Sequence, residues 1–377
     1  MGLPREQLLS ALCQRMEAKR QTLKELDDRY GKDRVWICSY LENIALPDLF
    51  GYDMNDLYSD PALGLEMELR HRIFWLDNSE DDCLPGLNVC ATVGMYFDLT
   101  LFGQEVRHTR QGVPEFTPHP ISREPELSLL PNAIDFHTSG IMPQMLAYCE
   151  QMQKLAGQWY GDEIKVNIGS LHRGPLDLYI QLRGYENFVD DTMDRPEFVR
   201  EMMAYLVRQR ARWNSERQKF LGAAPGEIQI HDDWVNIPFI TPAMFREFAL
   251  PAYLLLQELE GKVTFFHTCG VMTPVVGDLL ATFPGINCLN ISGWNDPEEL
   301  DRLVPHEIGF DLNFINTFTL SGNQAEHRDK LERIATIRRH RRVMLGAQAI
   351  VKLHDTMDED ISRMNNFIRL AREIMSA

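Results

Sequence analysis

An imidazole and a thiol lie two positions apart in the stretch KVTFFHTCGVMTPVVGDL, which covers residues 262–279. Residues of β-type composition precede His267 and Cys269, and Gly270 and Pro274 follow them, which predicts a strand, a turn and the start of a helix. Side chains alternate along an extended chain, so His267 and Cys269 point to the same side. Neutral imidazole and thiolate are ligands that zinc prefers. A buried cysteine that only fills space is the alternative interpretation.

The chain that must position this pair alternates between short apolar runs and amphipathic stretches. The predicted strands recur at about thirty-residue spacing, which is the pattern of a parallel sheet crossed by helices. They are expected at 35–39, 87–92, 164–170, 227–233, 263–267, 287–292, 307–313 and 343–350. Eight such units predict an α/β fold, a (β/α)8 TIM-type barrel, with an open doubly wound sheet as the alternative. No glycine-rich nucleotide-binding loop follows any predicted strand, which disfavours a nucleotide-binding version of that alternative.

Two segments lie outside this alternation. Residues 1–34 are predicted to form a charged, helical N-terminal extension, in which leucines recur at helical spacing, and the barrel covers residues 35–377. A proline-rich stretch from 103 to 135 has few periodic apolar residues and is predicted to be a long loop excursion. This loop either packs on the barrel or forms a mobile flap that faces a partner.

Polar side chains gather where the predicted strands end, and catalytic groups of a (β/α)8 barrel sit at those carboxyl ends. Asp232 and Asp233 close the fourth predicted strand, and with His267 and Cys269 they are the predicted catalytic residues. The predicted substrate-binding residues lie at or beyond the ends of the third, seventh and eighth strands, and they are His172, Tyr179, Asn313 and Gln348. Each group has a plainer interpretation, because aspartates can cap the next helix and Asn313 can close a turn.

Composition narrows the class of protein. The 377 residues are 44% hydrophobic and 25% charged, which is ordinary for one or two globular domains. A formal net charge of −17 argues against binding to a nucleic-acid backbone. No apolar run reaches the roughly 18 residues of a membrane span, and the N-terminus lacks the apolar centre of a signal peptide. Seven scattered cysteines suit a reducing cytoplasm better than a disulfide framework.

Three stretches of the chain resemble the uroporphyrinogen decarboxylase superfamily, and the resemblance covers most of the chain. They are IHDDWVNIPFITPAMFREFALPAY at 230–253, FFHTCG at 265–270 and LRGYENFVDDTMDRPEFVREMM at 182–203. The first resembles the decarboxylase phrase D-S-W, with Asp232 at its aspartate and Asp233 at its serine. The second resembles the H-x-C zinc motif of the cobalamin-dependent methyltransferases built on the same fold. The resemblance implies a (β/α)8 barrel with one large cleft at the carboxyl ends of its strands.

The resemblance also implies two branches with different chemistry. In the methyltransferase branch, zinc held by H-x-C and a later cysteine activates a thiol or binds a methyl donor or acceptor, and a separate corrinoid protein carries the methyl group. In the decarboxylase branch no metal is used, and arginines near the N-terminus hold the carboxylates of a tetrapyrrole. Residues 38–50 read CSYLENIALPDLF, without an arginine, although a polyanionic substrate needs fixed cations. Porphyrinogen decarboxylation is therefore disfavoured, and His267 with Cys269 favours the methyltransferase branch.

The sequence departs from the methyltransferase pattern in one respect, because no cysteine follows Cys288. Zinc at His267 and Cys269 therefore needs a third ligand from another part of the chain. The candidates are Asp232 or Asp233, Asp311 and Cys288, of which Cys288 lies in an apolar strand and suits the core. If the metal has been lost, His267 and Cys269 remain as a nucleophile pair or as relics.

We therefore expect a corrinoid-dependent methyltransferase of one-carbon metabolism, with zinc as cofactor and cobalamin carried by a partner protein. The small-molecule methyl donor or acceptor is expected to be of methyl ether, methylamine or thiol type. The enzyme is expected to be cytoplasmic, and a homodimer is one possible assembly. One alternative is a metal-free decarboxylase or lyase of the same fold that acts on a small acid through Asp232, Tyr179 and Asn313. Another is a non-catalytic barrel that only docks a corrinoid protein.

Overall fold

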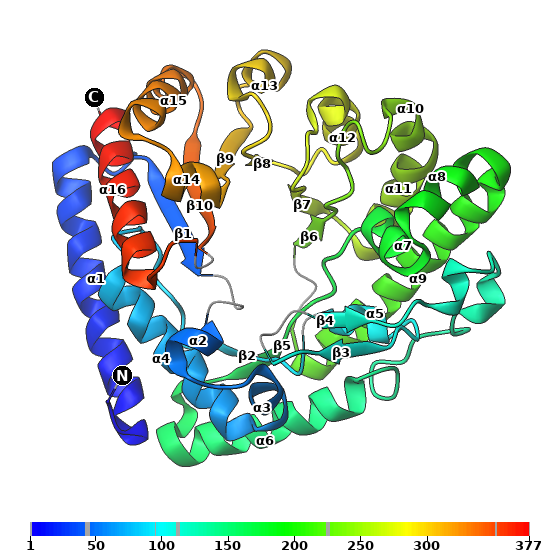
Figure 1. The fold of residues 1–377 in the computed structure, drawn as a ribbon, viewed down its shortest axis with the longest axis horizontal. Helices are drawn as coiled ribbons and strands as arrows, with labels where there is room; N and C mark the ends of the chain where they lie inside the picture. Colours follow the sequence, from blue (N-terminus) through cyan, green and yellow to red (C-terminus); the bar gives the residue numbers. More distant parts are fainter. Residues whose placement is uncertain are drawn as a thin grey trace.

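The computed structural model describes residues 2–41, 46–94, 96–110, 114–223, 227–350 and 353–376, with Tyr40, Leu41, Asn316 and residues 348–350 described by their backbone alone. Among these residues, eight parallel strands make the inner layer (Figure 1). They are β1 (Trp36–Leu41), β2 (Val89–Ala91), β5 (Val166–Ile168), β6 (Ile228–His231), β7 (Val263–His267), β8 (Cys288–Ser292), β9 (Gly309–Phe314) and β10 (Val343–Ile350). A short antiparallel pair, β3 (Val106–His108) and β4 (Pro114–Phe116), lies outside this set.

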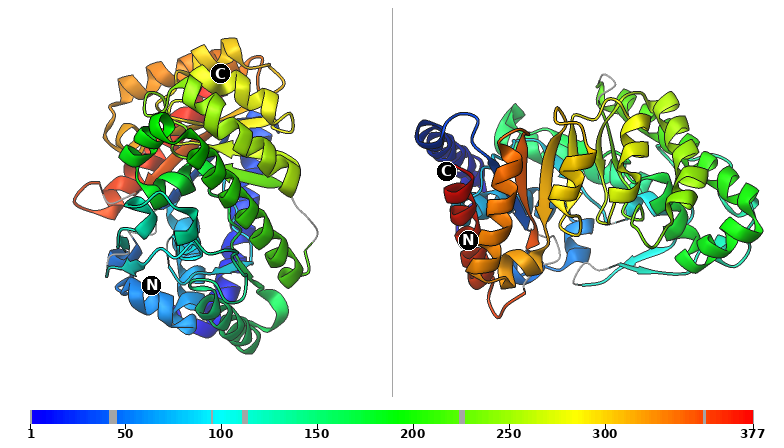
Figure 2. Two further views of the ribbon diagram at one scale, coloured as in Figure 1. Left: turned by 90° about the vertical axis from the view of Figure 1, so that its right-hand side faces the viewer. Right: turned by 90° about the horizontal axis from the view of Figure 1, so that it is seen from above.

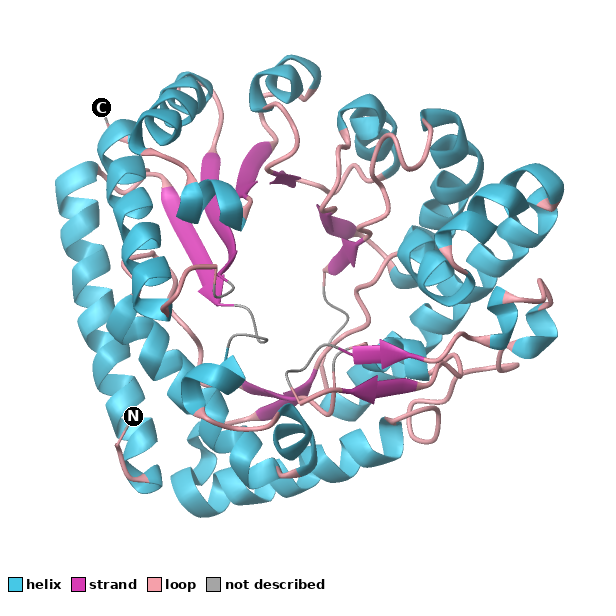
Figure 3. Cartoon of the chain, in the orientation of Figure 1, coloured by secondary structure: helices cyan, strands magenta, loops and turns pink. Residues whose placement is uncertain are grey.

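Helices lie on the outer side of the strands, as Figure 3 shows. The longer ones are α1 (Leu8–Tyr30), α4 (Pro61–Asn78), α6 (Met142–Tyr160), α7 (Pro175–Arg183), α8 (Tyr185–Asp194), α9 (Pro196–Leu221), α11 (Leu250–Glu260), α15 (Gln324–Arg338) and α16 (Met357–Met375). The shorter ones are α2 (Leu46–Phe50), α3 (Met54–Ser59), α5 (Phe97–Thr100), α10 (Pro242–Met244), α12 (Val276–Thr282), α13 (Pro297–Leu303) and α14 (Asn316–Ser321). None of the helices described combines the length and the apolar character that a membrane span requires.

Hydrogen bonds join the described strands in three parallel groups, which are β1–β10–β9–β8, β2–β5 and β6–β7. The pairing of β1 with β10 puts the first strand beside the last, with Trp36 opposite Met344. A single bridge between Arg173 and His231 links the chain that follows β5 to β6. Figure 1 shows the groups following one another around a ring. The chain is thus an α/β fold of parallel strands, as the alternation in the sequence predicts.

Strand β7 shows how each strand presents two faces. Phe266 is fully buried and packs against Tyr253 of α11 and Phe283 at the end of α12, with ring centroids 5.7 and 6.2 Å apart. Because side chains alternate along a strand, Phe265 and His267 point to the face opposite this helical layer. The apolar run that buries Phe266 therefore also sends the imidazole of His267 to the inner side of the ring.

The N-terminal helix α1 packs against α4. Ion pairs join Arg15 of α1 to Asp77 at 2.6 Å and Arg5, in the turn before α1, to Glu66 at 2.8 Å, and Leu12 belongs to the same buried core as the strands. Figure 2 shows the N-terminal and C-terminal helices on the same side of the molecule. The helical extension is thus present and shares the core, while the division of the chain at residue 34 stays a prediction.

The segment from 103 to 135, predicted to be a long loop, contains the β3–β4 pair and two 3₁₀ turns at Pro120–Ser122 and Leu127–Leu129. Ile121 is fully buried, and the Arg183 guanidinium donates hydrogen bonds to the carbonyl oxygens of Ile121 and Ser122 at 2.9 and 2.8 Å. Residues 111–113 lie outside the described part. Of the two interpretations of this segment, the described residues show the packed one, with more regular structure than expected.

Candidate metal centre and active site

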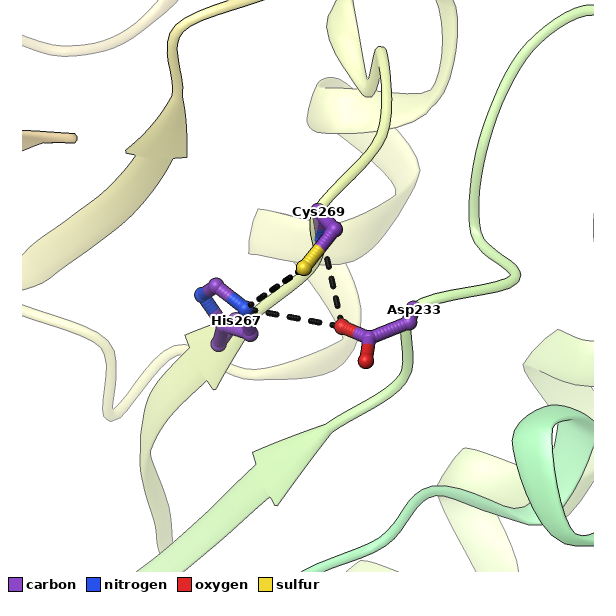
Figure 4. A group of neighbouring side chains, drawn as sticks. All are labelled: Asp233, His267 and Cys269. Atoms are coloured by element: carbon purple, nitrogen blue, oxygen red, sulfur yellow. Dashed lines mark hydrogen bonds and ion pairs between the residues drawn. The ribbon is translucent and has the colours of Figure 1, made fainter. Parts of the chain in front are cut away.

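Three of the predicted catalytic residues, Asp233, His267 and Cys269, converge at the carboxyl ends of β6 and β7, and we call them the carboxyl-edge cluster (Figure 4). Nε2 of His267 lies 3.3 Å from Sγ of Cys269 and 3.4 Å from Oδ1 of Asp233. The amide N–H of Cys269 donates to the same carboxylate oxygen at 3.3 Å. Asp233 and Cys269 are exposed and His267 is half-buried, so the cluster is accessible to a ligand from solvent.

These separations resemble the edges of a tetrahedral zinc site. With zinc bonds of about 2.0–2.1 Å to nitrogen or oxygen and about 2.3 Å to sulfur, a tetrahedron places nitrogen and oxygen donors about 3.3 Å apart and nitrogen and sulfur donors about 3.5 Å apart. The three donor atoms here lie within 4.8 Å of one another. They would occupy three corners and leave the fourth for water or substrate, which is the arrangement of catalytic zinc. Of the predicted third ligands, Asp233 is the one that joins the pair.

The orientation of the His267 ring is set from behind by β8 and β9. Nδ1 of His267 lies 2.5 Å from Oδ1 of Asn290, and Nδ2 of Asn290 donates to Oδ2 of Asp311 at 2.6 Å. Because the Asn290 amide nitrogen faces this carboxylate, its oxygen faces the imidazole and accepts a proton from Nδ1. The lone pair of Nε2 then points at Asp233 and Cys269, as a metal-ligating histidine requires. Burial raises the pKa of Asp311, and the hydrogen bond from Asn290 opposes that shift.

The turn that carries Cys269 is fixed by buried side chains. Thr268 is fully buried, and its hydroxyl donates to the carbonyl oxygen of Val235 at 2.9 Å. Asn295 donates to the carbonyl oxygen of Gly270 at 2.9 Å. A Cβ at Gly270 would collide with the side chain of Asn236, so glycine is needed for the two loops to approach this closely. The thiol is therefore presented by a turn held on both sides.

Asp232 adjoins Asp233 in the chain, but its side chain is fully buried. Its carboxylate accepts hydrogen bonds from the amides of Leu176 and Asp177 at 3.1 and 2.9 Å and from the Tyr253 hydroxyl at 2.7 Å. The two amides belong to the first turn of α7, so Asp232 caps this helix from a distant part of the chain. Burial raises the pKa of Asp232 well above its ordinary value, although the Tyr253 hydroxyl opposes the shift. Asp232 therefore caps a helix that precedes it in the chain and not the next helix, and its carboxylate does not join the carboxyl-edge cluster.

A row of histidines adjoins the carboxyl-edge cluster. The ring centroids of His172 and His231 are 4.5 Å apart, and those of His231 and His267 are 5.2 Å apart. Burial, together with the charge that His172 and His267 can carry, lowers the pKa of His231 to about 3, so this ring stays neutral. His172 is exposed, and the ring contacts through His231 place it at the same edge as His267.

Arg173, the residue after His172, is held between two carboxylates. Its Nε donates to Asp98 at 2.6 Å and its Nη1 donates to Asp177 at 2.8 Å. Burial raises the pKa of Asp177 to about 6, and the charge of Arg173 opposes that shift. The positive charge at this position is therefore already matched by neighbouring side chains.

The sequence pattern of the family described as Uroporphyrinogen decarboxylase (URO-D) matches residues 88–346, which is more than half of the chain. The chain belongs to the uroporphyrinogen decarboxylase family. Among solved structures, it is similar to a methyltransferase from Methanosarcina mazei, with a TM-score of 0.59 and 17% sequence identity, over 92% of this chain and 95% of that chain. At this identity the likeness shows a shared fold. A search of curated protein sequences finds no match.

In this uroporphyrinogen decarboxylase family member, the predicted substrate-binding residues lie in different environments. Tyr179 is fully buried, and its hydroxyl donates to Asp191 at 2.8 Å, so it exposes no surface to a ligand. Asn313 is buried at the end of β9, and a Cβ at Gly346 of β10 would collide with its side chain. The side chain of Gln348 lies outside the described residues. His172 is the predicted substrate contact that the structure places in the open beside the cluster.

Two asparagines that hold the site of this family member escaped prediction. Asn290 supports His267 and Asn295 supports the Cys269 turn, and both come from the segment that contains β8. Asn290 alternates with the buried apolar residues Leu289 and Ile291, so a polar position on the inner face was the signal that could have found it. Cys288 is absent from the cluster, and burial raises the pKa of its thiol to about 11.

Proposed function

We propose that this uroporphyrinogen decarboxylase family member is a zinc-dependent methyltransferase that moves a methyl group between a small substrate and a corrinoid protein. The observation that carries the proposal is the carboxyl-edge cluster, whose donor separations suit tetrahedral zinc with one open corner. The likeness to a methyltransferase from Methanosarcina mazei supports the same class of enzyme. In this proposal Asp233 takes the place of the late cysteine as third ligand.

We also infer that the eight parallel strands close a (β/α)8 barrel over residues 35–377. The pairing of the first strand with the last supports closure, and so does the bridge from the chain after β5 to β6. The hydrogen bond between His267 and Asn290 links β7 to β8, where two of the described groups meet. The carboxyl-edge cluster then lies at the end of the barrel where active sites of this fold are found.

Zinc held by Asp233, His267 and Cys269 would supply a Lewis acid that stabilises a thiolate or a leaving-group oxygen. His267 offers a neutral nitrogen because Asn290 holds the proton on its other ring nitrogen. Cys269 is the soft donor that favours zinc over magnesium or calcium. Methyl transfer is an in-line displacement, so its rate depends on position. The fixed turn around Cys269 serves the reaction by keeping the sulfur ligand in place.

The proposed partner is a corrinoid protein, with cobalamin bound to that partner. Asp233 and Cys269 are exposed, so a methyl group can be exchanged across this edge, and exposed His172 is the proposed contact for the small substrate. The substrate is proposed to be of methyl ether, methylamine or thiol type. A cytoplasmic location fits the seven cysteines, none of which forms a disulfide in the described part of the chain.

The alternative of a metal-free lyase acting on a small acid receives less support. Of its three expected polar groups, Asp232 and Tyr179 are fully buried and already hydrogen-bonded. A carboxylate substrate needs a cation to offset its desolvation. Arg173 is already engaged by Asp98 and Asp177, so it is poorly suited to that role.

Zinc content and methyl transfer test the proposal together. His267→Ala and Cys269→Ser would be purified without a metal-binding tag, beside the control variants His137→Ala and Cys13→Ser, which change exposed residues outside the cluster. Zinc is measured by mass spectrometry. Transfer is followed as methylation of cob(I)alamin by a panel of methyl ethers, methylamines and methyl thiols, and in reverse from methylcobalamin to a thiol.

We expect both cluster variants to lose one zinc ion and to transfer methyl groups about a thousandfold more slowly, which corresponds to roughly 4 kcal/mol. The two controls should match the wild-type protein. Cluster variants that keep wild-type zinc content and rate would contradict the proposal. A protein without zinc that decarboxylates a small acid at the same rate in every variant would favour the lyase.

A further inference from the structure

A second group of side chains that could hold a metal ion, Asp301, His306 and His340, comes from one helix and two turns, and we call it the amino-edge cluster. Asp301 is near the end of α13, His306 lies in the turn before β9, and His340 lies in the turn before β10. Nε2 of His340 is 2.9 Å from Oδ2 and 3.1 Å from Oδ1 of Asp301. The rings of His306 and His340 are 4.6 Å apart, and one donor atom from each of the three residues lies within 4.8 Å of the others.

This cluster lies at the opposite edge of the strands from the proposed active site. His306 and His340 precede the first residues of β9 and β10, which run parallel to β8. At the other end of β8, the hydroxyl of Ser292 donates to the carbonyl oxygen of Gly270, the residue after Cys269, at 2.9 Å. The carboxyl-edge cluster therefore sits at the carboxyl ends of these strands and the amino-edge cluster at their amino ends, so the methyl transfer proposed above does not use the second cluster.

A buried arginine holds residues 301–308, a segment that carries Asp301 at the end of α13 and His306 in the following turn. The Arg341 side chain is fully buried, and its guanidinium donates to the carbonyl oxygens of Val304, Pro305 and Ile308 at 2.7, 2.7 and 2.5 Å. Its Nε also donates to Oδ1 of Asp301 at 2.8 Å. Because Arg341 directly follows His340, one side chain fixes both turns relative to each other. The backbone that carries the three donors is thus held in place without a bound ion, which lowers the entropy lost when an ion binds.

The donor set indicates which ions could bind. Two imidazoles and one carboxylate suit borderline divalent cations such as zinc, cobalt or nickel better than magnesium or calcium. The separations of 2.9 and 3.1 Å between His340 and Asp301 are close to the roughly 3.3 Å edge of a tetrahedral site. An ion pair explains the contact between His340 and Asp301 but gives His306 no role. Among the described residues, no hydrogen bond engages the ring nitrogens of His306, so they are available to a metal.

We infer that Asp301, His306 and His340 form a second metal site, which binds a borderline divalent cation such as zinc and cross-links the turn before β9 to the turn before β10. An ion bound there joins two turns that are otherwise connected through α15 and Arg341. Its effect is structural, because it fixes the amino ends of β9 and β10, and β9 carries Asp311, which hydrogen-bonds Asn290 behind His267.

Cobalt titration of the metal-depleted protein tests this inference, because cobalt bound by a thiolate absorbs strongly in the near ultraviolet and cobalt bound by nitrogen and oxygen alone does not. The untagged full-length chain would be compared with His306→Ala and with Cys269→Ser. His137→Ala is the matched control, since His137 is also exposed and belongs to neither cluster. Competition with zinc then shows that the same sites take that ion.

We expect the wild-type protein and His137→Ala to bind two cobalt ions, of which one gives the thiolate absorption. His306→Ala should keep the thiolate absorption and bind the other ion at least about tenfold more weakly. Cys269→Ser should lose the thiolate absorption and keep the other ion. The inference would be overturned if the cobalt ion that gives no thiolate absorption bound equally well to His306→Ala. It would also be overturned if the wild-type protein bound no such ion. A wild-type protein that binds the other ion but shows no thiolate absorption would instead count against the proposed methyltransferase site.

Discussion

The two edges of the parallel strands carry donor sets of the same size that are supported in different ways. At the carboxyl edge, the imidazole of His267 is backed by Asn290 and Asp311, which are neutral and acidic groups inside the ring. At the amino edge, the carboxylate of Asp301 is backed by the buried guanidinium of Arg341, which also donates to four backbone carbonyl oxygens. The first arrangement orients one nitrogen lone pair, whereas the second fixes a turn.

The difference teaches that the chemistry of a donor set depends on the group behind it. A sulfur donor, an exposed carboxylate and an oriented imidazole make the carboxyl-edge cluster suitable for an ion that exchanges ligands with substrate. Two imidazoles and a carboxylate already paired with arginine make the amino-edge cluster suitable for an ion that holds loops together.

The largest expected effect is a loss of stability that distinguishes Asp232 from the adjacent Asp233. Asp232→Ala should destabilise the protein by about 3–5 kcal/mol, because two amides of α7 and the Tyr253 hydroxyl lose a buried acceptor at a cost of about 1–3 kcal/mol each. Asp233→Ala should change stability by less than about 0.5 kcal/mol, since Asp233 is exposed, yet should weaken metal binding at the carboxyl edge. Urea unfolding and metal titration measure the two effects. Equal losses of stability in both variants would show that the residues do not differ as described.

Replacement of the buried guanidinium should act on the amino edge alone. Arg341→Lys is expected to cost about 2–3 kcal/mol of unfolding free energy and to weaken metal binding by the amino-edge cluster, because an ammonium cannot reach all the oxygens that Arg341 contacts. Arg342→Lys, at the exposed neighbouring position, is the matched control. Thermal unfolding and cobalt titration provide the readouts. A change in the thiolate absorption of Arg341→Lys would contradict the independence of the two edges.

Removal of the amide behind His267 should act on the carboxyl edge alone. Asn290→Leu is expected to weaken metal binding there by about 10–100-fold, because the imidazole loses the partner that fixes its tautomer and orientation. Metal affinity at the amino-edge cluster serves as the internal control and should not change. If zinc affinity at the carboxyl edge is unaffected, the Asp311–Asn290–His267 chain has no orienting role.

The smallest expected effect is a difference in pH dependence between two carboxylates. Burial raises the pKa of Asp177 to about 6. Between pH 4 and 6 the folded state therefore binds more protons than the unfolded state. As pH rises through that window, the contribution of Asp177 to the free energy of unfolding falls by about 1–2 kcal/mol. At Asp301, burial acts to raise the pKa, but hydrogen bonds from Arg341 and His340 outweigh burial, and the net pKa is lowered. The ionised Asp301 therefore stabilises the fold, and this stabilisation is lost only as pH falls below about 4. Unfolding of Asp177→Asn between pH 4 and 6 and of Asp301→Asn below pH 4 should show opposite changes of slope. Parallel profiles for the two variants would contradict these assignments.

Much of the fold could be predicted from the sequence because apolar runs and helical patterns repeat regularly. The strands Val263–His267 and Val343–Ile350 have the predicted bounds, and the other predicted strands differ by a few residues at their ends, where frayed pairing is not encoded in periodicity. The β3–β4 pair was not predicted, since proline-rich sequence masks short strands. The 3₁₀ turn at Pro120–Ser122 in the same segment is held by Arg183, which lies about 60 residues away in the chain and leaves no local signal.

The candidate site was predictable where chemistry follows spacing along one strand. His267 and Cys269 share a face because side chains alternate, and the structure places their donor atoms 3.3 Å apart. The distinct roles of Asp232 and Asp233 could not be predicted, because they depend on where the first turn of α7 lies. The amino-edge cluster likewise joins residues from separate turns, with no motif that links them.

The hydrogen bond between His267 and Asn290 also determines how many protons leave when a metal arrives. Because the ring nitrogen that faces the cluster already lacks hydrogen, His267 has no proton to lose, and the thiol of Cys269 must lose its proton to bind the metal as a thiolate. Zinc uptake at this edge should therefore release close to one proton per ion, and its affinity should rise about tenfold for each unit of pH until that thiol is fully deprotonated.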